Sequence, residues 1–111
     1  MQVIKDMDTA SNKISGTYKV GSLVGVSYWD LKNTFGTPTF NEASADDKVQ
    51  KEWVFDFKGQ TFTIYDWKTY DEQYTVEELK LWSIGGNSNA DDFETMVLHL
   101  IANQPVSEGL A

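Results

Sequence analysis

Residues 53–67 read WVFDFKGQTFTIYDW, two alternating aromatic runs on either side of one glycine. This spacing predicts a β-hairpin with a two-residue turn at Lys58–Gly59, because glycine accepts the positive φ that such turns need. The turn sets Trp53 opposite Ile64 on a face that we expect to be buried, since a one-residue slip would place aromatic rings opposite threonines. The other face is half polar and is expected to be wet. The further expected pairs are Phe57 with Gln60, Phe55 with Phe62, Lys51 with Asp66, Asp56 with Thr61, Val54 with Thr63, Glu52 with Tyr65 and Gln50 with Trp67.

The sequence on both sides of the hairpin predicts two helices. Ser27 and Asp30 form a capping-box pattern at the start of a helix over Tyr28–Phe35. A second helix is predicted from about Ala90 to Ile101, because its apolar residues recur on one helical face. The candidate caps of this helix are Ser88 and Asn89.

Strands are predicted at Gly16–Val26, with a turn at Gly21–Ser22, and at Leu79–Ile84, which Gly85–Gly86–Asn87 would end. Adjacent strands without helices between them argue against a parallel sheet. The predicted fold class is therefore α+β, an antiparallel sheet of three to five strands with two helices packed on one face.

Length, charge and composition narrow the class of protein. The 111 residues predict one domain over 16–103, preceded by a flexible arm or edge strand over 1–15 and followed by a tail over 104–111. The formal net charge of -8 would repel nucleic acid and an anionic membrane surface. There is no arginine, no cysteine and only one histidine. We therefore expect no cofactor and no bound metal.

Enzyme activity and membrane insertion are both disfavoured by the sequence. Asp56 and Asp66 on the hairpin could serve as paired catalytic carboxylates. A domain of this size seldom frames a deep cleft, so we expect a protein that is not an enzyme. No segment has signal-peptide or membrane-span character, which predicts a cytoplasmic protein.

Acidic and aromatic residues are concentrated in the stretch that follows the hairpin. Tyrosine and tryptophan are enriched in binding hot spots, and loops seldom carry this many large rings without a use. We therefore predict a partner-binding surface, with rings that cover a sheet edge beside a solvated loop as the alternative. The residues of this surface are Asp66, Trp67, Tyr70, Asp71, Glu72, Tyr74, Glu77 and Glu78.

A second candidate site is the glycine stretch before the last helix. Backbone amides in such a turn can hold a phosphate group. Two aspartates in the first helical turn would repel that phosphate, and a plain strand-to-helix turn is the competing interpretation. The candidate ligand-binding residues are Gly85, Gly86, Asn87 and Ser88.

Two resemblances to known families rest on these motifs. Over residues 26–67, the order of helix, Phe35-Gly36-Thr37-Pro38, polar loop and hairpin resembles the small modules of outer-membrane assembly lipoproteins and β-lactamase-inhibitory proteins. The signal peptide, lipidated cysteine and disulfides of those families are missing, so the resemblance implies only an α+β module. In size, charge and strings such as Tyr65-Asp66-Trp67, the whole chain resembles the small acidic orphan proteins of tailed bacteriophages. That class includes inhibitors of host nucleases and of bacterial defence systems.

The sequence leaves three functions open. The first is a non-enzymatic binding protein, such as a phage-encoded inhibitor in the host cytoplasm, whose carboxylates imitate DNA in the basic cleft of a host or defence protein. This hypothesis involves no direct contact with nucleic acid or membrane. The second is a sponge that sequesters a signalling nucleotide or another small ligand. The third is a self-associating structural or assembly protein, so monomer and homodimer both remain open.

Overall fold

The predicted hairpin is present and has the predicted register. A computed structural model describes residues 1–42, 49, 51–67 and 80–104. Strand β3 (Glu52–Phe57) pairs with β4 (Gln60–Tyr65), and Trp53 lies opposite Ile64. Lys58 and its neighbouring glycine both have positive φ in the turn, as a hairpin with a two-residue loop requires.

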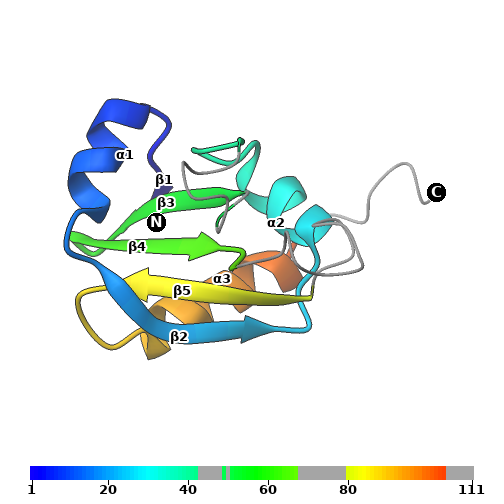
Figure 1. The fold of residues 1–111 in the computed structure, drawn as a ribbon. Helices are drawn as coiled ribbons and strands as arrows, with labels where there is room; N and C mark the ends of the chain where they lie inside the picture. Colours follow the sequence, from blue (N-terminus) through cyan, green and yellow to red (C-terminus); the bar gives the residue numbers. More distant parts are fainter. Residues whose placement is uncertain (43–48, 50, 68–79, 105–111) are drawn as a thin grey trace.

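The hairpin lies inside a five-stranded antiparallel sheet of order β1-β3-β4-β5-β2 (Figure 1). With three helices beside the sheet, the α+β fold class is confirmed. The other strands are β1 (Gln2–Val3), β2 (Tyr18–Val24) and β5 (Leu81–Gly86), and the helices are α1 (Met7–Ile14), α2 (Tyr28–Phe35) and α3 (Asp91–Ala102).

The main core lies between one face of the sheet and helices α2 and α3. Trp53, Trp82 and Phe93 are fully buried there, and the rings of the two tryptophans meet edge to face with centroids 5.7 Å apart. The indole N–H of Trp53 donates to the Gly36 carbonyl at 2.9 Å, and that of Trp82 donates to the Val26 carbonyl at 2.9 Å. Both indoles are therefore buried without an unpaired donor.

The first fifteen residues contain an edge strand, which was one of the two expected forms, and a helix that was not expected. The side chain of Asp6 caps α1 by accepting from the Thr9 amide at 2.9 Å. Helix α1 contacts β4 on the sheet face opposite the main core. Ala10 of α1, Val54 and Thr63 are buried outside that core, so the expectation that this whole face is wet is wrong.

Two expectations about glycine are also wrong. Gly21 does not form a turn with Ser22 but lies inside β2, next to a register shift that follows Lys19. Gly85 and Gly86 belong to β5 instead of ending it. They are needed because neighbouring strands leave no room for a side chain: a Cβ on Gly86 would lie 2.8 Å from the ring of Phe62.

The helices that cover the core follow the predicted bounds closely. At α2, the Asp30 amide donates to the Ser27 hydroxyl and the Ser27 amide donates to the Asp30 carboxylate, both at 3.0 Å. The predicted capping box is therefore confirmed. The N-cap of α3 is Ala90, which offers no side-chain cap. Asn89, one of the two expected caps, lies one residue earlier and accepts from the Asp91 amide at 2.8 Å.

Candidate functional site

The predicted partner surface is only partly within the described residues. Asp66 is fully buried, and its carboxylate accepts from the Lys51 amide at 2.7 Å. The carboxylate thus extends the hydrogen bonding of the hairpin by one pair, and the expectation that it lies on an exposed surface is wrong. Trp67 is 50% exposed. The members that lie outside the described residues are Tyr70, Asp71, Glu72, Tyr74, Glu77 and Glu78.

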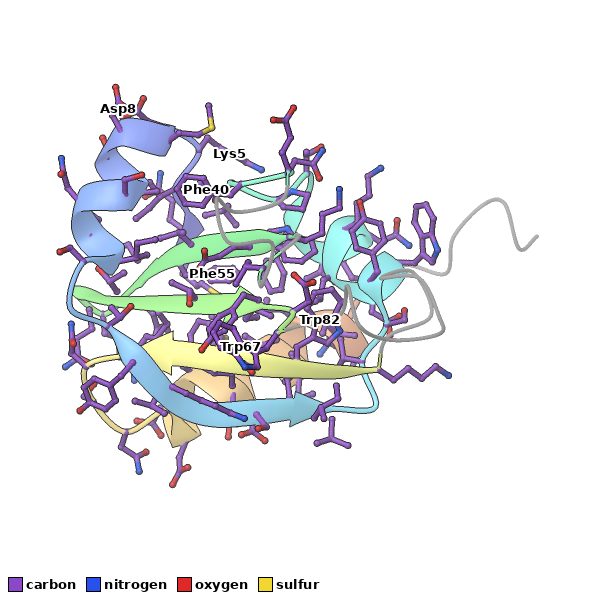
Figure 2. The ribbon with its side chains drawn as sticks, viewed as in Figure 1. Lys5, Asp8, Phe40, Phe55, Trp67 and Trp82 are labelled. Atoms are coloured by element: carbon purple, nitrogen blue, oxygen red, sulfur yellow. The ribbon has the colours of Figure 1, made fainter. Side chains whose placement is uncertain are left out.

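Trp67 lies two residues beyond the end of β4, and exposed apolar residues are also found on β2 and β5. Val24 and Leu81 are register partners on β2 and β5, with exposed fractions of 73% and 56%. Tyr65 and Ser83 form the last pair between β4 and β5, and extending their register by two residues would set Trp67 opposite Leu81. We call Val24, Leu81 and Trp67 the apolar row. It lies on the sheet face away from the main core, and Figure 2 shows Trp67 over the β4–β5 part of the sheet.

Glu52 and Tyr65, which are register partners on β3 and β4, both have raised pKa values. Burial raises the pKa of Glu52 to about 7, and the Asp66 carboxylate adds to the rise, while a hydrogen bond with the Thr63 side chain opposes it. Burial also raises the pKa of Tyr65, which lies on β4 opposite Glu52. The negative charge of Glu52 raises the pKa of Tyr65 further. A hydrogen bond with the Ser83 side chain works against this second shift.

Glu52 also lines a cavity of about 630 Å³ beside α1. One wall is α1 and the other is the segment 39–42, which runs beside β3. Figure 2 shows Phe40 of this segment between α1 and the sheet. The lining residues are Met7, Ser11, Ile14, Thr39, Phe40, Asn41, Glu42, Val49 and Glu52. No sequence motif indicated this cavity, because its walls come from four separate segments.

The stability of the fold should depend on the protonation of Glu52. The folded-state pKa of about 7 lies above the ordinary value of 4.5, so the native state binds the proton more tightly than the unfolded state. We expect this contribution to be fully present below about pH 4.5 and to be lost as the pH rises to about 7, by about 1–3 kcal/mol. Urea unfolding at pH 5 and pH 8 measures the loss.

Glu52→Gln should remove that pH dependence and be the more stable protein at pH 8. Asp56→Asn is the matched control, because Asp56 lies on the same strand and sheet face but is exposed. An unchanged difference in unfolding free energy between pH 5 and pH 8 in Glu52→Gln would contradict the assignment.

The glycine stretch does not have the loop form on which its candidate ligand site depended. Gly85 and Gly86 lie within β5 and are paired with residues of β2 and β4. Their amides are therefore not part of a phosphate-binding turn. The Ser88 hydroxyl is hydrogen-bonded to the side chain of Gln60. Asn87 remains in the short connection to α3. Ligand binding by these residues stays a prediction.

Within the described ranges, no group of three His, Cys, Asp or Glu side chains could hold a metal ion. No helix in these ranges is both long and apolar enough to cross a membrane. Comparison of the chain with protein-family models, curated proteins and solved structures gives no match.

Proposed function

We propose that the protein is a non-enzymatic binding protein whose contact surface is centred on the apolar row. The observation that carries this proposal is the exposure of Val24 and Leu81, which are register partners on β2 and β5, together with that of Trp67, two residues beyond β4. Single exposed apolar residues are common, but a contiguous group on a sheet face marks an interaction site. A tryptophan beside aliphatic residues is a typical binding hot spot.

The charge of the chain favours a basic protein as the partner. The net charge is -8, and four acidic residues lie in the stretch of chain that joins Trp67 to Lys80. Both ends of this stretch are at the apolar row, because Lys80 directly precedes Leu81. A positively charged partner would be attracted by these carboxylates and would bury the apolar row. An inhibitor that occupies the basic cleft of a host or defence protein is the form that the phage resemblance supports.

Substitution of the apolar row tests the proposal. The immobilised chain is used to capture proteins from a lysate of its source cells, and each captured protein is then purified and measured in binary binding. We expect a basic partner whose affinity falls about 30-fold or more with Trp67→Ala, the effect of losing a hot-spot tryptophan. Leu81→Lys should weaken binding further, because it places a cation before a basic surface.

Trp29→Ala is the matched control for that experiment. Trp29 is 51% exposed, almost the same fraction as Trp67, but lies on α2. Its removal should leave the affinity unchanged. Equal affinities of the wild type, Trp67→Ala and Leu81→Lys for the purified partner would overturn the proposal.

A second copy of the chain is the competing occupant of this surface. Strand β2 is an outermost strand of the sheet and carries Val24, so self-association could cover the same residues. Sedimentation velocity at two concentrations separates the two cases. A wild-type dimer that dissociates on the substitution Leu81→Lys would show that this surface serves self-association instead.

A further inference from the structure

We propose that the cavity beside α1 binds a small apolar amine, with the apolar body between α1 and Phe40 and the ammonium group on the Glu52 carboxylate. This site is separate from the apolar row and does not depend on the function proposed above. Its volume of about 630 Å³ is in the range of small-molecule pockets, which are mostly apolar with a few placed polar groups.

The walls of the cavity supply the surface for an apolar body. Met7 and Ile14 line the cavity from the two ends of α1, about two turns apart, and Phe40 and Val49 line it from other segments. Met7 is 58% exposed and is not part of the hydrophobic core. A bound apolar group would remove these side chains from water, which is the principal source of affinity in such a site.

The wall opposite α1 is held in place before any ligand arrives. The Thr39 hydroxyl donates to the Ile4 carbonyl at 2.6 Å and accepts from the Val54 amide at 3.1 Å. Phe40 and Glu52 exchange two backbone hydrogen bonds, both of 2.9 Å. Little ordering is therefore needed on binding, which favours affinity.

The charges around the cavity select a cation. The charged lining residues that are described are two carboxylates, Glu42 and Glu52. The ammonium of Lys51, the residue that precedes Glu52, donates to the backbone and side-chain oxygens of Asn41, both at 2.9 Å. An ammonium ligand would relieve the cost of the partly buried Glu52 carboxylate, whereas a carboxylate ligand would be repelled.

Protonation of Glu52 should control the affinity for an amine. Besides burial, the groups that act on Glu52 are the Thr63 side chain and the Asp66 carboxylate. Tyr65 faces Glu52 from β4, and the lining residues of α1 are uncharged. Because the pKa of Glu52 is raised to about 7, its carboxylate is charged at pH 8 and neutral at pH 5.5. Amine binding should therefore strengthen as the pH rises between these values.

The test uses 2-phenylethylamine as the probe and 2-phenylethanol as its neutral counterpart. Binding is followed at pH 8 and pH 5.5 by chemical-shift changes of backbone amides, including those of Met7, Ser11 and Glu52. At pH 8 we expect the amine to bind about tenfold more tightly than the alcohol, the effect of one charge-assisted hydrogen bond. At pH 5.5 this preference should largely disappear.

Three variants make the assignment specific. Glu52→Gln should abolish the preference for the amine, whereas Glu42→Gln, at an exposed lining position, should preserve most of it. Ser11→Leu should fill the cavity from α1 and weaken both probes without changing Glu52. The proposal is overturned if neither probe shifts these amides, if the two bind equally at pH 8, or if Glu52→Gln retains the preference. Loss of partner binding in the apolar-row variants would not affect these results.

Discussion

Trp53→Ala should lower the free energy of unfolding by about 3–5 kcal/mol, the usual cost of removing a buried tryptophan. Trp53 is fully buried in β3 and its ring packs against Tyr28 and Trp82, with centroids 5.9 and 5.7 Å away. The substitution leaves a large cavity and also an unpaired carbonyl at Gly36, which accepts the indole N–H. Because small domains are stable by only about 5–15 kcal/mol, much of the protein's stability should be lost.

Urea unfolding followed by circular dichroism measures this loss. Trp53→Phe should cost less than Trp53→Ala, since it keeps a ring in the core and loses the hydrogen bond. Trp29→Ala should change the stability by less than about 0.5 kcal/mol, because that side chain is half exposed. A loss below about 1 kcal/mol for Trp53→Ala would show that the β3 face is not the centre of the core.

The second large effect is expected at Gly86, where adding one methyl group should cost about 1–3 kcal/mol. A Cβ there would lie 2.8 Å from the Phe62 ring, too close for any real contact. The ring cannot easily move away, because it stacks on Phe93 at 4.6 Å with an interplanar angle of only 12°. Gly86→Ala must therefore displace a strand or disrupt the aromatic stack.

Gly21→Ala is the matched control for Gly86→Ala. Gly21 lies in β2, the strand that pairs with β5. A Cβ at Gly21 would meet its nearest neighbour, the Ala90 side chain, at an ordinary 3.5 Å. We expect its stability to stay within about 0.5 kcal/mol of the wild type. Phe62→Leu should reduce the cost of Gly86→Ala in a double-mutant cycle, because it shortens the clashing side chain. Equal costs at the two glycines would refute the packing explanation.

Local patterns predicted the hairpin and α2 well, because each carries its own geometric signal. Glycine after Lys58 sets the turn, and the aromatic alternation leaves only one register with a dry face. The capping pair at Ser27 and Asp30 likewise sets the start of α2. These signals act over a few residues, so the sequence alone is sufficient to interpret them.

Residues whose roles depend on distant segments were harder to predict. Gly85 and Gly86 look like a loop, but the reason for them is the side chains of β4, which are some twenty residues away in the sequence. Asp66 looks like a surface acid until the Lys51 amide is placed beside it. Trp82 lies in a stretch that does not alternate cleanly between polar and apolar residues. Its burial could not be predicted without knowing that its indole N–H donates to the Val26 carbonyl.

Helix α1 was missed although a signal for it exists. Asp6 precedes a segment in which the apolar residues Met7, Ala10 and Ile14 recur at helical spacing. The polar composition around them hid this short apolar stripe. Without α1, Glu52 would lie on a solvent-exposed sheet face. Neither its raised pKa nor the cavity beside it could then be expected.

The strand order has a consequence for how the chain folds during synthesis. Strands β1 and β2 form the two opposite edges of the sheet, yet both are made before any strand with which they pair. Strand β2 pairs with β5, which ends at Gly86 and is the last of the described strands to be made. A ribosome-bound chain therefore cannot complete this sheet until β5 has emerged. Such long-range pairing makes folding slow and leaves β2 without its partner, and available to other chains, until then.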